Sequence, residues 1–248
     1  MLISAKKLQG YQLQATDGEV GAIDDLLFDD QVWHIRFLVA RLQKMLPWSE
    51  KVLINPLYLN KPDSHQGVLN VDLNQQSIRK SPPLSSSKPV SQHEKERAFK
   101  AYGYADYWAA PGLGATLPHS APLIDDIRQD AENQAQADQA HLRSCKAVSG
   151  YHIHTQDGGI GHVDDFIIDA EHWSCAYLLV NTRNWLPGGR DVLISRDAVE
   201  AISWHKHQVK LNIATEVIKR APHFDVEKLS KPLMARDIED EAVLPQAC

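Results

Sequence analysis

Histidine is the residue type whose positions most strongly suggest chemistry in this sequence. Seven of the twelve histidines fall between residues 150 and 223. His152 and His154 alternate on one face of an expected strand, and a hairpin centred near Asp157 places His162 about opposite His152. Imidazole groups arranged in this way bind zinc, nickel or copper. The alternative interpretation is that these histidines are solvated surface residues.

Adjacent aspartates, Asp24-Asp25 and Asp164-Asp165, raise the question of a cation site. Neighbouring residues of a strand point to opposite faces, so one pair does not converge on a single ion. A calcium loop needs several oxygen ligands in a spaced series, and the sequence lacks one. The pairs are therefore interpreted as turn or bulge residues that accept hydrogen bonds from nearby backbone N–H groups.

Three further patterns resemble catalytic motifs only superficially. The segment Pro111–Thr116 lacks the ending of a phosphate-binding loop, and the spacing of Ser85 and Lys88 falls in a Pro/Ser-rich stretch without its partner motifs. Cys175 lies in an alternating strand and is interpreted as a small core residue rather than a nucleophile. The sequence therefore predicts no catalytic residues, no cofactor and a protein that is not an enzyme.

Four aromatic residues gather in a Gly/Pro-rich stretch: Tyr102, Tyr104, Tyr107 and Trp108. Such side chains are costly to leave in water. One interpretation is that they pack over or between the β units of this chain. The other is that they dock onto a second chain, where Tyr and Trp are typical anchors.

The elements that position these residues belong to an internal sequence repeat. Residues 10–82 align with residues 150–222 without a gap. The shared positions are mostly turn and core residues, among them Gly10/Gly150, Tyr11/Tyr151, Asp17/Asp157, Gly18/Gly158, Gly21/Gly161, Asp24/Asp164, Asp25/Asp165, Trp33/Trp173 and Pro47/Pro187. The two copies are therefore expected to share one fold.

Each copy reads as short strands separated by turns. In the first copy Asp17-Gly18 predicts a tight hairpin, and Gly21 together with the paired aspartates predicts a bulge in the strand that follows. The next strand alternates, so Trp33, Ile35, Phe37 and Val39 are expected to share one face. The equivalent residues of the second copy are Trp173, Cys175, Tyr177 and Leu179.

This pattern predicts a mainly β protein with two small closed antiparallel barrels in tandem. A pair of open sandwiches is the alternative. We expect barrel 1 at residues 1–82, a linker with short helices and the aromatic stretch at 83–144, barrel 2 at 145–222, and a tail with a short helix at 223–248. The linker helices are expected near 92–102 and 123–144.

The ordered set of Gly-Tyr, Asp-Gly, Asp-Asp, Trp and Val-Leu-Ile motifs resembles the PRC-barrel family, in two tandem copies. That family includes the cytoplasmic domain of the photosynthetic reaction-centre H subunit, a domain of a ribosome maturation factor, and stand-alone bacterial proteins. The H subunit has an N-terminal membrane helix and the maturation factor a preceding domain. The residues before Gly10 supply neither, so the resemblance favours the stand-alone type.

Composition limits the partners. The net charge of −6 and the pI near 6.0 argue against a nucleic-acid binder, which needs clustered Lys and Arg. The three cysteines are far apart without CxxC spacing, which is typical of a reducing cytoplasm. We expect no membrane span, because no apolar run is long enough. The partner is predicted to be a protein or a second copy of the chain.

Together these observations predict a non-enzymatic binding or assembly module that mediates protein–protein contacts. The first alternative is a metal-binding or metal-dependent protein that uses the His-rich second copy. The second alternative is an accessory role at a photosynthetic electron-transfer complex, which only the family resemblance implies.

Overall fold

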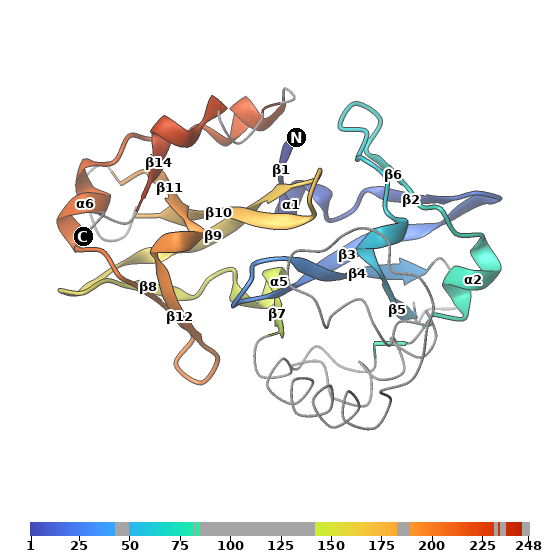
Figure 1. The fold of residues 1–248 in the computed structure, drawn as a ribbon, viewed down its shortest axis with the longest axis horizontal. Helices are drawn as coiled ribbons and strands as arrows, with labels where there is room; N and C mark the ends of the chain where they lie inside the picture. Colours follow the sequence, from blue (N-terminus) through green and yellow to red (C-terminus); the bar gives the residue numbers. More distant parts are fainter. Residues whose placement is uncertain are drawn as a thin grey trace, which may run out of the picture.

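The computed structural model describes residues 1–42, 50–81, 83–84, 142–182, 189–230, 233 and 237–244. The described chain is mainly β and forms two sheets with short helices (Figure 1). We call residues 1–84 the first half and residues 142–244 the second half. The expected linker helices, the aromatic stretch, Pro111–Thr116, Ser85 and Lys88 lie outside the described residues.

The first half contains the strands expected from the sequence, together with a first strand and three short helices that were not predicted. In chain order its elements are β1 (Leu2–Ser4), α1 (Ala5–Leu8), β2 (Gln12–Ala15), β3 (Gly18–Asp29), β4 (Ile35–Leu42), β5 (Lys51–Ile54), the 3-10 helix η1 (Pro56–Tyr58), β6 (Val68–Asn70) and α2 (Gln75–Arg79).

The second half repeats this order and adds a C-terminal segment. Its elements are β7 (Leu142–Ser144), α5 (Cys145–Val148), β8 (His152–His154), β9 (Gly159–Asp169), β10 (Ser174–Asn181), β11 (Asp191–Ser195), η2 (Arg196–Ala198), β12 (Val199–Ser203), β13 (Gln208–Leu211), α6 (Thr215–Arg220), η3 (Val226–Ser230), η5 (Glu239–Glu241) and β14 (Ala242–Val243).

The strand order is equivalent in the two sheets. One sheet runs β5-β4-β3-β2-β6, and the other runs β12-β13-β8-β9-β10-β11-β14. Most neighbours are antiparallel, as expected, but three pairs are parallel: β2 with β6, β8 with β13, and β11 with β14. The prediction of antiparallel barrels was therefore wrong at the β2–β6 and β8–β13 pairs. Among the described strands the hydrogen-bonded order of each sheet is open at both ends, so the ladders do not show a closed barrel.

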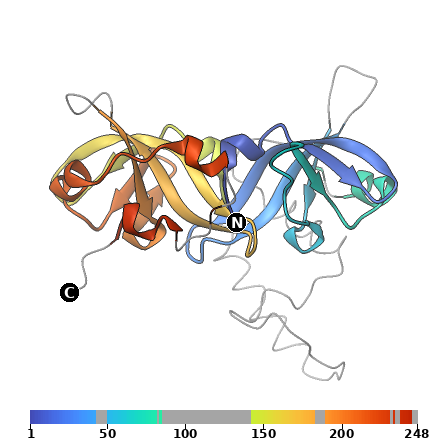
Figure 2. The same cartoon turned by 90° about the horizontal axis from the view of Figure 1, so that it is seen from above.

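The halves exchange their first strands. β1 of the first half pairs with β9 of the second, and β7 of the second half pairs with β3 of the first. In Figure 1 β1, α1, α5 and β7 lie between the two halves, and Figure 2 shows the N terminus at the same central position. The sequence assigned residues 142–144 to the linker and kept residues 1–82 together, and neither range anticipated this exchange.

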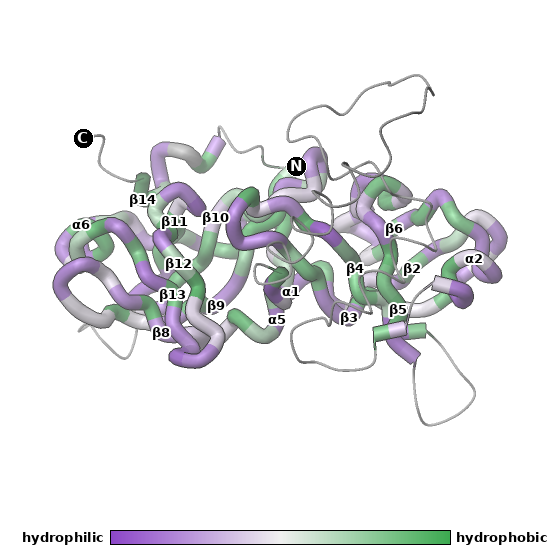
Figure 3. Tube along the Cα trace, turned by 60° about the horizontal axis from the view of Figure 1, so that its bottom comes forward, coloured by the Kyte–Doolittle hydropathy of each residue, from purple (hydrophilic) through white to green (hydrophobic). Residues whose placement is uncertain are grey.

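One apolar core runs through both halves. It contains Leu8, Ile23 and Leu38 of the first half together with Val148 and Val163 of the second, all essentially inaccessible to water. Figure 3 shows apolar residues, in green, along strands of both halves. The central strands β3, β4 and β10 are buried along most of their length, because the shared core covers one face and smaller apolar clusters pack on the other.

The prediction that Trp33, Ile35, Phe37 and Val39 share one face was wrong. A register shift between β3 and β4 separates Ile35 from Phe37. Trp33 and Ile35 therefore pack in the shared core, whereas Phe37 and Val39 pack on the opposite face. A bulge has this effect because one extra residue reverses which side chains face the core.

The same correction applies to the second half. Trp173 and Cys175 lie in the shared core, whereas Tyr177 and Leu179 pack on the outer face with Phe224 and other residues of the C-terminal segment. That segment thus covers the outer face of the second sheet. None of the helices in the described ranges is long and apolar enough to cross a membrane.

The expected turn chemistry is confirmed. β2 and β3 form an antiparallel hairpin at Asp17-Gly18, and β8 and β9 form its counterpart at Asp157-Gly158. The turn aspartates also reach the helix that closes each half. Asp17 accepts a hydrogen bond from the backbone N–H of Gln75 at 2.7 Å, and Asp157 accepts one from Thr215 at 2.7 Å. Each hairpin is therefore tied to a helix about 58 positions later in the chain.

Candidate functional site

The exchanged segments have one design. We call Leu2–Leu8 the first arm and Leu142–Val148 the second arm. Each arm is a three-residue strand followed by a four-residue helix. A serine joins the two parts: Ser4 Oγ accepts the N–H of Lys7 at 3.0 Å, and Ser144 Oγ accepts the N–H of Ala147 at 2.9 Å. Serine at the N-cap stabilises a helix start because it satisfies a backbone donor there.

The apolar side chains of the arms are fully enclosed. Leu2, Ile3 and Leu8 are at most 1% exposed, and so are Cys145 and Val148 of the second arm. Burying a leucine or isoleucine of this kind contributes about 1.5–3 kcal/mol. Each arm is therefore held by hydrophobic burial as well as by its strand pairing.

Each arm binds to the second aspartate of an Asp-Asp pair in the other half. Asp165 accepts hydrogen bonds from the hydroxyl of Ser4 and from the backbone N–H of Lys6, the latter at 3.1 Å. Asp25 accepts the equivalent bonds from Ser144 and from Lys146, again at 3.1 Å to the N–H. We call Asp164–Asp169 the β9 receptor and Asp24–Asp29 the β3 receptor.

Burial raises the pKa of the Asp25 carboxyl and that of the Asp165 carboxyl above the usual value. The hydrogen bonds from the serine hydroxyls and backbone N–H groups act in the opposite direction without cancelling the effect of burial. A buried carboxylate is costly unless it has donors, and the arm supplies them. The receptor and the arm are therefore complementary in chemistry.

The first residue of each aspartate pair lies at a bulge, as expected, and binds a lysine of the arm. Asp164 forms an ion pair with Lys6 of the first arm at 2.8 Å. Asp24 lies 3.8 Å from the Lys146 ammonium of the second arm and 2.8 Å from that of Lys51. The sequence predicted backbone hydrogen bonds for these pairs, but it did not predict that the donors come from the other half.

A second set of reciprocal contacts lies at the centre of the molecule. The N–H of Ile35 donates to the carbonyl of Trp173 at 2.7 Å, and the N–H of Cys175 donates to that of Trp33 at 2.7 Å. Phe28 and Phe166 meet with ring centroids 5.0 Å apart. These pairs relate the halves as a two-fold axis relates the subunits of a homodimer.

Both tryptophans at this centre have an unusual backbone. The φ angle is +61° at Trp33 and +46° at Trp173, in the left-handed region that bulky residues rarely adopt. A backbone of this kind costs on the order of 1–3 kcal/mol and persists only where the surroundings over-determine it. The shared contacts between the halves supply that constraint.

The core cysteines lie beside the same centre. Cys145 of the second arm lies beside Cys175 of β10, and burial, with a further effect of the neighbouring Cys175 thiol, raises the pKa of the Cys145 thiol well above its usual value. Cys175 is fully buried, which agrees with the prediction of a small core residue. A buried thiol with a raised pKa is a poor nucleophile.

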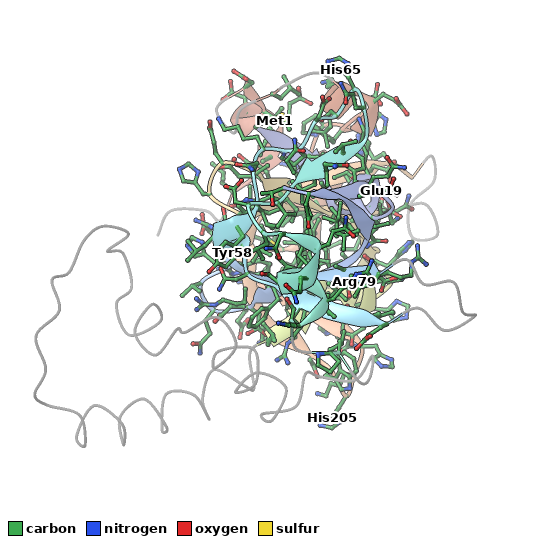
Figure 4. All side chains as sticks on the ribbon, turned by 90° about the vertical axis from the view of Figure 1, so that its right-hand side faces the viewer. Met1, Glu19, Tyr58, His65, Arg79 and His205 are labelled. Carbon is green, nitrogen blue, oxygen red and sulfur yellow. The ribbon has the colours of Figure 1, made fainter. Side chains whose placement is uncertain are left out.

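The histidine hairpin has the predicted register, since His152 of β8 lies directly opposite His162 of β9. His154 is exposed on the same strand. Within the described ranges, no three or more His, Cys, Asp or Glu side chains come close enough together to hold a metal ion. Figure 4 shows His205 projecting from the loop between β12 and β13.

That loop differs between the halves. In the second half Tyr151, Trp204 and His207 form an aromatic group, with centroids 5.1 Å apart for Tyr151 and His207. The first half has Ser64 and Gly67 at the positions of the last two. This group packs against the core and is specific to the second half.

Comparison with protein-family models gives no match, and comparison with curated proteins gives no significant match. The resemblance to the PRC-barrel family stays a prediction. The function must therefore be argued from the contacts between the arms and their receptors.

A sequence signal for the arms exists. The alignment of the two copies continues before Gly10, where Leu2, Ser4 and Lys6 match Leu142, Ser144 and Lys146. This extension marks the arms as part of the repeat. It does not reveal which half receives them, because strand pairing between distant segments is set by the tertiary fold. All four predicted partner-binding aromatics lie outside the described residues, namely Tyr102, Tyr104, Tyr107 and Trp108.

Proposed function

We propose that this protein is a non-enzymatic assembly module of the PRC-barrel type that works through protein–protein contacts. The observation that carries the proposal is the reciprocal exchange of the arms. Each receptor recognises a segment that is distant in sequence through strand pairing, a buried carboxylate and an ion pair. Addition of a strand to an existing sheet is a common way for one protein to bind another.

The order of elements supports the family type. Both halves contain a strand arm, an Asp-Gly hairpin, a long bulged strand and a closing helix in the same sequence positions. Long strands β3 and β9 each pair with three other strands. A strand that is long and bulged can serve two parts of a curved sheet, which is how small barrels are built.

Light scattering on the full chain tests the assembly role. We expect the wild type to exceed the monomer mass, alone or with a partner from its own source. Replacing the aromatic anchors, in Tyr107→Ala/Trp108→Ala, is expected to reduce that mass. A matched control is Val32→Ala/Leu57→Ala, which removes exposed apolar side chains elsewhere. Monomeric behaviour of all three proteins, with no partner bound, would contradict the proposal.

A metal-binding role is the second candidate, and the direct pairing of His152 with His162 favours it. The first half has Gln12 and Ala22 at the same paired positions. The variant His152→Gln/His162→Ala therefore copies a pair that this fold already accommodates. Metal content of tag-free, dialysed protein measures the role. A value near one ion per chain that the variant loses supports it, and a value near zero removes it.

A further inference from the structure

The two arms are interchangeable in their backbone pairing. In the first arm Leu2, Ile3 and Ser4 lie opposite Asp169, Ile168 and Ile167. In the second arm Leu142, Arg143 and Ser144 lie opposite Asp29, Phe28 and Leu27. Each pair in one set is the repeat equivalent of a pair in the other, so the register is identical. Each receptor therefore contacts the same features of its arm: a leucine, a capping serine and a backbone N–H two residues after that serine.

The exchange does not depend on which chain supplies the arm. The two halves are joined covalently only through residues 85–141. Both ends of that segment, Leu84 and Leu142, pack in the same outer apolar cluster of the first sheet. A chain can therefore fill its own receptors. Each strand pairing and hydrogen bond described between an arm and its receptor joins a residue of one half to a residue of the other half. Two copies can therefore make the same contacts between chains.

We propose that the β3 and β9 receptors are binding sites for the arm of a second copy of this chain, so that chains assemble by trading arms. This inference deepens the proposed assembly role and rests on it. At low concentration the covalent connection keeps the arms within one chain, since it gives them a high effective concentration. When copies are crowded together, arm exchange links them. Exchange of identical elements is a low-cost route to dimers.

Two complementary full-chain variants test the site. Variant A lacks residues 1–9 and so leaves its β9 receptor open. Variant B carries Asp165→Lys, which removes the acceptor of the Ser4 hydroxyl and of the Lys6 backbone N–H, buries a cation beside these donors and so releases the first arm. Sedimentation of the mixture is expected to show a one-to-one complex of A and B. Variant C carries Asp164→Asn at the neighbouring residue, which is 36% exposed, so it removes the ion pair with Lys6 but keeps the Asp165 acceptor in place. We expect C to keep its own arm and to leave A unbound.

A synthetic peptide of residues 1–10 provides a second measurement on variant A. The peptide is expected to bind A and to displace B from the complex. A peptide of residues 141–150 should bind more weakly, because Arg143 takes the place of the fully buried Ile3 and Ala170 takes the place of its ion-pair partner Asp30. Replacing Ser4 by alanine in the first peptide should weaken binding about 2- to 30-fold, which is the range expected for loss of a helix cap.

The outcomes separate this inference from the assembly role itself. If A folds cooperatively but binds neither peptide nor B, the arm site is overturned. If A is unfolded alone, restoration of its cooperative unfolding transition by the 1–10 peptide supports the site, and no restoration overturns it. In either negative case, a wild-type assembly that depends on Tyr107 and Trp108 would still support the assembly role by another surface.

Discussion

The carboxylate of Asp25 accepts a hydrogen bond from the hydroxyl of Ser144, although 119 positions separate the two residues along the chain. The same bond joins Asp165 to Ser4 in the opposite direction. Each half thus contributes one arm, whose helix is capped by a serine, and binds the arm of the other half. The repeat in the sequence is therefore better described as two interlocked copies than as two separate units, because neither copy contains all of its own core.

The buried aspartate of the β9 receptor should contribute far more stability than its neighbour. Replacing Asp165 by alanine leaves the hydroxyl of Ser4 and the N–H of Lys6 without an acceptor, so we expect a loss of about 2–4 kcal/mol in the free energy of unfolding. Replacing Asp164 removes an ion pair with an exposed lysine and should cost about 1 kcal/mol or less. Urea denaturation of both variants measures the difference, and equal losses would contradict the assigned roles.

The receptor aspartates should also make stability depend on pH. Burial raises the pKa of Asp25 and Asp165 above 3.8, so the folded protein holds their protons at pH values where the unfolded chain releases them. Their contribution is fully present below pH 3.8 and is lost as pH rises through the folded pKa. We expect Asp25→Asn/Asp165→Asn to flatten the decline in unfolding free energy above that pH. Chemical denaturation across pH 4 to 8 measures it, with Asp164→Asn as control.

Local turn chemistry was predictable from the sequence because it depends on neighbours in the chain. The Asp-Gly hairpins and the bulges at Asp24 and Asp164 follow from residues that stand next to one another. The equivalence of the halves was also predictable, since an ungapped repeat preserves the register of Gln12 with Ala22 and of His152 with His162.

Properties that depend on distant segments were not predictable in the same way. The prediction of which face Phe37 occupies was wrong. The bulge that reverses this face lies in the pairing of β4 with β3, and the alternating sequence pattern does not reveal it. The arms were missed because a three-residue strand carries little periodic signal and its acceptor lies in the other half. The role of Asp25 and Asp165 was consequently only half predicted: the acceptor was identified, but the donor was not.

Asp157, the turn aspartate of the second half, should make the free energy of unfolding depend on pH in the acidic range. Hydrogen bonds from the backbone and side chain of Thr215 and from the hydroxyl of Thr155 lower the pKa of Asp157 from 3.8 to about 2. Its contribution is present above pH 3.8 and is lost as pH falls toward about 2. We expect Asp157→Asn to reduce the acid sensitivity of unfolding in this window. The control is Asp197→Asn, an exposed aspartate in the same half; equal effects of the two would refute the assignment.

The bulge glycines should tolerate no side chain. A Cβ added at Gly21 would lie 2.2 Å from the carbonyl oxygen of Arg41, and one added at Gly161 would lie 2.2 Å from that of Asn181. The backbone of the paired strand would have to move, so we expect alanine at either position to cost more than about 2 kcal/mol. Thermal and urea unfolding of the two variants measures the cost.

Gly67 is the matched control for this prediction. Its φ of +66° is also left-handed, but an added Cβ would meet nothing within 4 Å. The second half already places a larger residue at the equivalent position, where His207 adopts a φ of +48°. Gly67→Ala should therefore cost only the conformational penalty of about 1 kcal/mol. If Gly67→Ala proved as damaging as Gly21→Ala, backbone conformation rather than close strand contact would be what the bulge glycines supply.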